Sequence, residues 1–168
     1  MDEPTSASAP AVPARRKATS AGRAIAGLVL LACTGILGLA AYLKPDARGY
    51  GTHQRLGFAP CGFLLKTGYP CPTCGMTTAF SYAVRGRLVS AFLAQPAGLG
   101  LALATVLAGA GAIWVLVAGR LPSRLRVEPS PHLLFWGLLL FMLGGWAFKL
   151  ILGLADGSLP LHSVRVSP

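Results

Sequence analysis

Three cysteines in the middle of the chain stand at spacings that support chemistry. Cys61 is followed after nine residues by Cys71, and Cys71 after two residues by Cys74, which gives the pattern C-x9-C-x2-C. Cysteine thiolates bind metal ions, form disulfides and attack other disulfides. A fourth cysteine, Cys33, lies inside a long apolar run and is expected to pack as a small hydrophobic side chain. The segment from Cys61 to Cys74 is therefore the candidate functional site.

Zinc binding is the first chemistry that this spacing allows. A C-x2-C pair can converge on one tetrahedral zinc ion, and the turn-forming Gly and Pro residues of the loop can bring Cys61 back to join it. Tetrahedral zinc needs a fourth ligand, and His53 is the histidine nearest to the cysteines on the same loop. The sequence thus offers a site of Cys61, Cys71, Cys74 and His53, or three cysteines completed by water or a second protomer.

Two other uses of the cysteines compete with zinc. A disulfide from Cys61 to Cys71 or Cys74 would clamp the loop and contribute about 2 to 3 kcal/mol of stability. A redox site is the alternative, because Cys71-Pro72-Thr73-Cys74 resembles the C-P-x-C sites of glutaredoxin-like enzymes, with Cys71 attacking and Cys74 resolving. No strand, helix, strand pattern surrounds these residues. We therefore expect a non-enzymatic structural cluster first, and a membrane thiol-disulfide oxidoreductase second.

Long apolar runs are the elements that must position these cysteines. Hydrophobic residues make up 54% of the chain and charged residues 12%, a composition that excludes an ordinary soluble globule. Three runs are long enough to cross a bilayer as helices, at about 1.5 Å per residue. They cover residues 24–43, 97–119 and 133–155. We expect an all-α membrane protein with three transmembrane helices and one or two short interfacial helices between the first and second spans.

These spans divide the rest of the chain. Residues 1–22 are rich in Ala, Ser and Pro and are expected to be disordered, and residues 156–168 are expected to form a flexible tail. The membrane domain then covers residues 23–155, with the cysteine loop and interfacial helices at 60–95. The first run exceeds the usual length of a signal-peptide core, so it is interpreted as an uncleaved anchor. Lys149, a charge inside the third run, is expected to snorkel toward the headgroups.

A short amphipathic helix is predicted from Thr73 to about Val84. The proline steps before it keep the chain out of helix, so the helix can begin only after them. Polar side chains then share one side and apolar side chains another, at helical spacing. The polar set is Thr77, Thr78, Ser81 and Arg85, and the apolar set is Met76, Ala79, Phe80 and Ala83. This helix is too short to cross a bilayer and is expected to lie at the interface or to dip in against the spans.

Basic residues near the span ends give the expected orientation. They crowd before the first span and in the short second loop but are spread over the longer first loop. Because cytoplasmic loops retain basic residues, we expect a cytoplasmic N-terminus, an inner membrane location and a cysteine loop outside, where thiols tend to oxidise. The net charge of +10 forms no basic stripe interleaved with aromatics, so nucleic acid is not an expected partner.

Small residues predict where another helix can approach the second span. They recur every four residues along one face: Gly100, Ala104, Ala108 and Ala112. Such a face lets helix backbones come close in lipid, whether the partner belongs to this chain or to a second copy. The expected partners are therefore the lipid bilayer and, through this face, a protein partner or a homo-oligomer.

The cysteine segment resembles the signature of a bacterial membrane protein family catalogued as domain of unknown function 2752. That signature has a Cys about ten residues before a Cys-Pro-x-Cys-Gly-x-Thr-Arg core, and later an Asn-Pro step into a span. The matching residues are Cys61, Cys71, Pro72, Cys74, Gly75 and Thr77, with Gly86 at the family's glycine break and Gln95-Pro96 at the Asn-Pro step. Thr78 stands where the family has Arg, so a role of that charge is not carried over. The resemblance implies a bacterial membrane architecture and a cysteine site, and it assigns no reaction.

Overall fold

The computed structural model describes residues 18–120 and 130–159, and these residues form a helical membrane protein. Three helices are long: α1 (Ser20–Tyr42), α5 (Pro96–Ala118) and α6 (Pro131–Ala155). Each is long and apolar enough to cross a membrane, with mean hydropathy between 2.0 and 2.3. The predicted all-α fold and its three spans are confirmed. Each boundary lies within four residues of its predicted position, because the apolar runs set the helix lengths.

Short helices join the first two spans. They are a 3-10 helix, η1 (Thr52–Leu56), and three α-helices, α2 (Gly62–Thr67), α3 (Met76–Ala83) and α4 (Leu88–Ala94). The sequence predicted one or two. Glycines divide the segment further, since Gly68 ends α2 at φ 75° and Gly75 precedes α3 at φ 92°. For this reason α3 begins at Met76 and not at the predicted Thr73.

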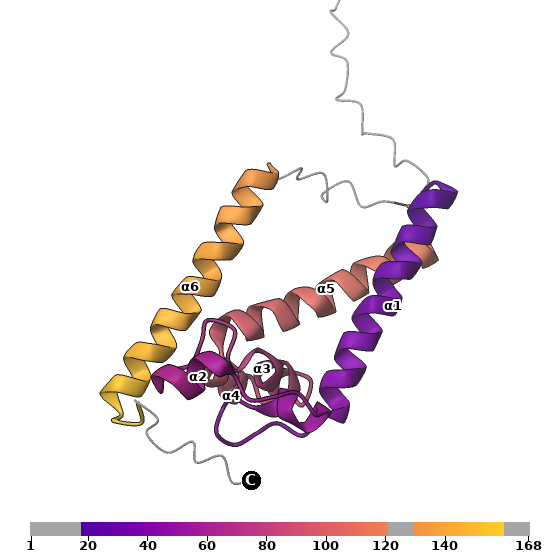
Figure 1. Ribbon diagram of the computed structural model, residues 1–168. Coiled ribbons are helices and arrows are strands. Elements are labelled where there is room, and N and C mark those ends of the chain that lie inside the picture. The colour runs from indigo at the N-terminus through magenta and orange to yellow at the C-terminus, as the bar shows by residue number, and fades with distance from the viewer. Residues whose placement is uncertain (1–17, 121–129, 160–168) are drawn as a thin grey trace, which may run out of the picture.

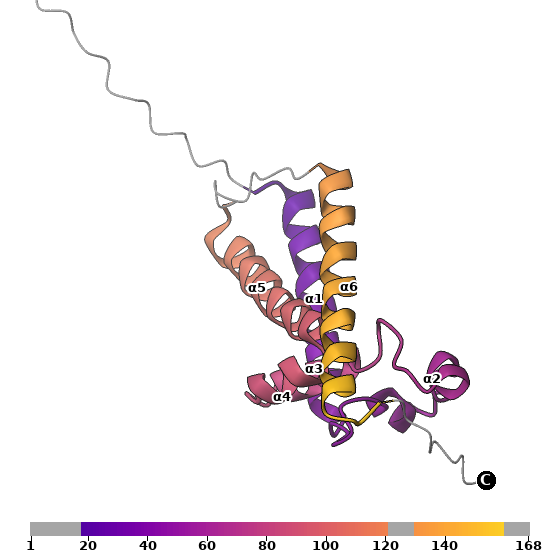
Figure 2. The same cartoon turned by 90° about the vertical axis from the view of Figure 1, so that its left-hand side faces the viewer.

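The three long helices and the short ones form two levels (Figure 1). Helix α5 runs antiparallel to α1, and the backbone N–H of Ala18 donates to the carbonyl of Gly119 at their shared end, at 2.8 Å. Helix α6 lies on the other side of α5. Helices α3 and α4 lie at the opposite end, close to the first turns of α5, and α2 lies at the same end but projects away from the spans (Figures 1 and 2). The cysteine loop therefore lies at one end of the spans.

Helix α3 caps the end of α1. The last carbonyls of a helix have no partner within it and need donors from elsewhere. The hydroxyl of Ser81 donates to the carbonyls of Ala40 and Leu43 at 2.9 and 3.0 Å, and the Arg85 guanidinium donates to Ala41 at 2.7 Å. Two members of the predicted polar side of α3, Ser81 and Arg85, thus face the end of α1.

Small residues let α5 approach its neighbours. A Cβ on Gly100 would lie 2.5 Å from the ring of Phe141 on α6. A helix of the same chain therefore already packs against this glycine. Ala112 packs against Ala26 of α1. The other two members of the predicted small-residue face, Ala104 and Ala108, are exposed.

Packing inside α1 also follows the sequence. Cys33 is buried in α1, and a Cβ on Gly109 of α5 would lie 3.5 Å from its Cβ, in ordinary contact. This confirms that Cys33 packs as a small hydrophobic side chain.

The predicted tails lie mostly outside the described residues, as do residues 121–129, which carry basic residues used to predict the orientation. Within the predicted N-terminal tail, residues 20–22 already belong to α1. The Thr19 side chain caps this helix by accepting from the N–H of Gly22 at 3.1 Å.

Replacing Ser81 by alanine should lower the stability of the folded protein. The change leaves two carbonyls at the end of α1 without this donor, which costs about 1 to 3 kcal/mol for a buried group. The measurement is thermal unfolding in detergent, with Ser90→Ala on α4 as the matched serine control. Equal melting temperatures for the two variants would contradict the capping role.

Candidate functional site

Three cysteine sulfurs converge beside α3. The Sγ atoms of Cys61, Cys71 and Cys74 lie within 4.8 Å of one another, and those of Cys71 and Cys74 are 3.3 Å apart. All three side chains are free thiols in this structure. The tertiary structure therefore brings together the three cysteines that the sequence singled out.

Local turns produce this convergence. Cys61 immediately precedes α2, and Gly68 then turns the chain back toward the cluster. The N–H of Cys74 donates to the carbonyl of Cys71 at 2.9 Å, which closes a tight turn between these two residues. Both sulfurs of the C-x2-C pair consequently lie in the turn before α3 and not in its first helical turn.

Side chains from other helices hold the backbone of this turn. The indole N–H of Trp146 on α6 donates to the carbonyl of Pro70 at 2.7 Å, and the Nε2 of Gln95 donates to the carbonyl of Pro72 at 2.8 Å. Gln95 is fully buried between α4 and α5, and its Oε1 has no hydrogen-bond partner among the described residues. Trp146 of the third span thus binds the cysteine loop.

Lys149 makes the third of these contacts. Its Nζ donates to the carbonyls of Ala94, Cys74 and Gly49 at 2.8, 3.2 and 3.4 Å. An ammonium group has three N–H donors, so the three carbonyls use all of them. The prediction that Lys149 snorkels toward the headgroups is wrong, because carbonyls of the folded loop lie within its reach.

Gly75 leaves room for the Lys149 ammonium and its carbonyl partners to meet beside the cysteine turn. A Cβ at this position would lie 2.6 Å from the carbonyl oxygen of Ala94, 2.7 Å from that of Gly49 and 2.8 Å from Nζ of Lys149. Its φ of 92° is also unfavourable for other residues. Glycine is therefore required both by space and by backbone conformation.

A pocket of about 360 Å³ opens onto the three cysteines. His53 of η1 also lines it but is not one of the side chains whose ligand atoms meet within 4.8 Å. Three threonines complete a polar wall: Thr73, Thr77 and Thr78. Thr78 is buried, and its hydroxyl forms a hydrogen bond of 2.7 Å with that of Thr52. The residue that departs from the family signature thus joins α3 to η1.

The two sulfurs of the C-x2-C pair differ in acidity. Burial by itself raises the pKa of Cys71, but hydrogen bonds with Thr73, Cys74 and Cys61 outweigh it and lower the pKa to about 7. Burial and the hydrogen bond with Cys71 together raise the pKa of Cys74 to about 12. When the metal-free pair loses one proton, Cys71 is therefore the thiol that gives it up, and Cys74 keeps its own.

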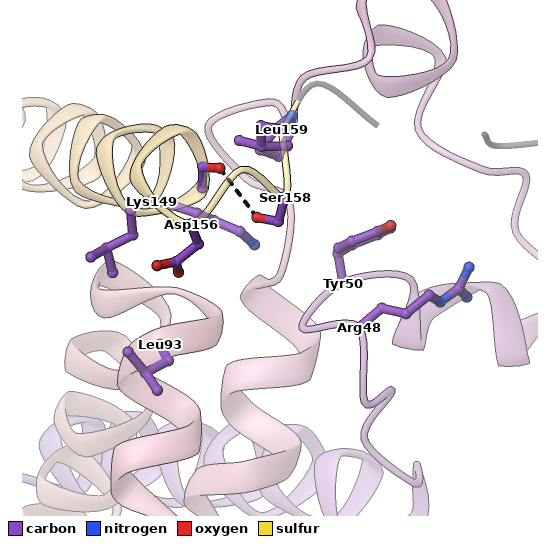
Figure 3. Close-up of a pocket in the computed structure, with 10 residues that line it drawn as sticks. Arg48, Tyr50, Leu93, Lys149, Asp156, Ser158 and Leu159 are labelled. Atoms are coloured by element: carbon purple, nitrogen blue, oxygen red, sulfur yellow. Dashed lines mark hydrogen bonds between the residues drawn. The ribbon is translucent and has the colours of Figure 1, made fainter. Parts of the chain in front are cut away.

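Lys149 also borders a second pocket, of about 410 Å³, at the end of α6 (Figure 3). Arg48 and Tyr50 face it from the loop after α1, and Asp156 faces it from the end of α6. The Arg48 side chain is bound to the Asp46 carboxylate at 2.8 Å, and this hydrogen-bonded pair lowers the pKa of Asp46. The cations around this pocket are thus already engaged by other groups.

Sequence reasoning did not assign Trp146, Lys149 or Gln95 to the site. For Lys149 and Gln95, the sequence did contain a feature that could have pointed to a role in the site. Lys149 is a charge inside an apolar span, and such charges are rare unless they have a partner. Gln95 stands at the family's step into the second span. Neither signal names the carbonyl that each side chain binds.

The pH dependence of alkylation should report the lowered pKa of Cys71. In reduced, chelator-treated protein, its reaction with iodoacetamide should reach half the maximal rate near pH 7, since the thiolate reacts and is lost as the pH falls below the pKa. Thr73→Val should move this midpoint upward because it removes a hydrogen bond to the thiolate. Peptide mass spectrometry gives the rate, and a wild-type midpoint near the ordinary value of about 8.5 would contradict the assignment.

Gly75→Ala should disrupt the cysteine turn. The new methyl group cannot fit among two carbonyls and the lysine ammonium, so the loop must leave α6. Alkylation of the buried Cys74 should then become at least about tenfold faster, which corresponds to about 1.4 kcal/mol. Gly62→Ala is the matched control, because a Cβ there meets nothing within 4 Å. Equal alkylation rates in the two variants would show that a methyl group fits at Gly75 without displacing the loop.

The comparisons with known proteins concern this same segment. Residues 61–109 match a family described as "Protein of unknown function (DUF2752)", and the matched range runs from Cys61 through α2, α3 and α4 into α5. Neither the search of curated proteins nor the search of solved structures found a match. This segment is therefore similar to the family of unknown function DUF2752, and the matched range contains all three clustered cysteines.

Proposed function

We propose that Cys61, Cys71 and Cys74 bind one zinc ion. The observation that carries this proposal is that three sulfurs, and not two, meet within 4.8 Å. In a tetrahedral site with Zn–S bonds of about 2.3 Å, neighbouring sulfurs are about 3.8 Å apart. That spacing lies between the 3.3 Å of the Cys71–Cys74 pair and the 4.8 Å limit of the cluster. A disulfide would use two of these thiols and leave the third without a role.

His53 is the proposed fourth ligand. It lines the pocket that opens onto the cysteines, and η1 carries it on a loop bounded by glycines at positive φ, Gly51 and Gly57. In this proposal a shift of this loop brings the imidazole to the metal. Water entering the same pocket is the other candidate, which would leave an exchangeable coordination position.

The role proposed for this centre is structural, in support of binding or assembly. The cysteine loop has few buried apolar side chains, so metal binding would supply folding energy that its small core lacks. Helix α2 and the residues before it expose three large apolar side chains: Phe58, Phe63 and Leu65. A zinc-stabilised loop would present these side chains to a protein partner or to lipid.

The proposed setting is the inner membrane of a bacterium. The N-terminus lies in the cytoplasm and the cysteine loop outside it in this proposal, which follows the distribution of basic residues along the sequence. The exposed Ala104 and Ala108 are the part of the small-residue face of α5 that is left for a second copy or another membrane partner.

A thiol-disulfide oxidoreductase is the second candidate, favoured by the unequal exposure of the pair. Cys71 is partly exposed, whereas Cys74 is 7% exposed and 3.3 Å away. In such a reaction the Cys71 thiolate attacks a disulfide of a partner protein and releases one partner thiolate. Cys74 then loses its proton and attacks the mixed disulfide, so the partner leaves reduced and Cys71 and Cys74 become bonded.

Metal analysis of cysteine variants tests the zinc proposal. Protein purified in detergent without added metal should carry about one zinc per chain by mass spectrometry of the element. Cys61→Ser, Cys71→Ser and Cys74→Ser should each lose most of this zinc and become more sensitive to protease. Cys33→Ser is the matched control, because Cys33 is buried in α1 outside the cluster, and it should keep its zinc.

Two outcomes would contradict zinc and select another function. Wild-type protein without zinc, with two thiols protected from alkylation until reductant is added, would indicate a disulfide. Zinc-free protein in which Cys71→Ser stays folded but no longer reduces a peptide disulfide would indicate the oxidoreductase.

A further inference from the structure

We propose that Lys149 is the counter-charge of the cysteine metal centre, so that α6 takes part in metal binding without supplying a ligand. This inference rests on the zinc site proposed above. It assigns a positioning and electrostatic role to a residue of a membrane span that lies 75 residues from Cys74 in sequence.

The contacts of Lys149 fix its charge at the cysteine loop. Its Nζ donates to the carbonyl of Cys74 itself, at 3.2 Å, and to those of Gly49 and Ala94. With all three N–H groups donated to backbone, the ammonium has none left for a ligand in the neighbouring pocket (Figure 3). The ammonium group is therefore held against the backbone of the turn that carries Cys74.

No described carboxylate pairs with this ammonium. The ion pair within the described residues is Arg48 with Asp46, and Asp156, which shares the second pocket, forms none with Lys149. Placing an unpaired charge in a partly buried position is costly unless another group offsets it. The thiol side chain nearest to the charge in the hydrogen-bonded structure is that of Cys74, whose carbonyl lies 3.2 Å from Nζ and whose sulfur lies 3.3 Å from that of Cys71.

The charge of Lys149 matches the net charge expected for the proposed zinc centre. A Zn²⁺ ion with three thiolates carries a net charge of −1, and the +1 of Lys149 neutralises it. A neutral fourth ligand, His53 or water, leaves this sum unchanged. Opposite charges attract more strongly in a site of low dielectric than in water, so the partly buried lysine stabilises the anionic centre. Outer groups of this kind typically change metal affinity by about 10 to 100-fold.

Metal affinities of four variants test the proposal, in purified full-length protein titrated against chelators. Lys149→Gln keeps two amide donors but removes the charge, and it should bind zinc at least about tenfold more weakly. Trp136→Phe is the matched control, because it removes an indole donor of α6 that bonds to His132, away from the cysteine loop, without changing charge. It should bind zinc within about threefold of wild type, which is less than 0.7 kcal/mol.

Monovalent copper distinguishes charge from tethering. A Cu⁺ ion with three thiolates has a net charge of −2, so removing the lysine charge should weaken copper binding by a larger factor than zinc binding. If Lys149 only ties the loop to α6, its replacement would weaken the binding of zinc and of copper by the same factor. Equal factors, or unchanged affinities in Lys149→Gln, would overturn the proposal.

A second pair of variants leaves Lys149 in place, in case its replacement prevents folding. The Tyr50 ring lies 5.9 Å from Nζ of Lys149, so Tyr50→Glu would set a carboxylate beside the ammonium, and Tyr50→Gln is the neutral control. Zinc should bind more weakly to the Glu variant than to the Gln variant, and equal affinities would overturn the inference. Wild-type protein that binds neither metal would refute the zinc site and this role together, whereas wild-type binding with no lysine effect would refute only the role of Lys149.

Discussion

Hydrogen bonds to backbone carbonyls attach the cysteine loop to α6 and thereby orient the whole cysteine end of the molecule. Trp146 and Lys149, three positions apart on one face of α6, donate to the carbonyls of Pro70 and Cys74. Gln95 adds a donor to Pro72 from the start of α5. Because three alternate carbonyls of this turn are held by side chains of other elements, the thiols face one another.

Close approach of backbones makes this attachment possible. Gly75 admits Lys149 and two carbonyls at distances that a Cβ would occupy. Gly145 of α6 does the same for Ala97 at the start of α5, where an added Cβ would lie 3.1 Å from the backbone N of Ala97. In lipid there is little hydrophobic drive for helices to associate, so packing between small residues and polar contacts must supply it. Glycine at these positions is the reason that a short loop and two spans can meet at one point.

Polar side chains are buried in this protein, whereas many large apolar side chains are exposed. Large apolar side chains point outward from the three spans, as expected for helices in lipid, while the fully buried side chains include Thr52, Thr78, Ser81 and Gln95. Each of these polar groups forms at least one hydrogen bond to another part of the chain. The interior at the cysteine end is therefore organised by hydrogen bonds more than by apolar contact, which explains why a metal centre there would add needed stability.

The three spans and the choice of the cysteine cluster follow from the amino-acid sequence alone. Run length and hydropathy suffice for the spans, because a bilayer requires about 20 apolar residues whatever their neighbours are. Spacing sufficed to choose Cys61, Cys71 and Cys74 over Cys33. The burial of Thr78 and Ser81 on α3 and the inward direction of Lys149 result from tertiary packing. Those outcomes depend on partners up to 100 residues away, and local periodicity carries no information about which distant carbonyl will be in reach.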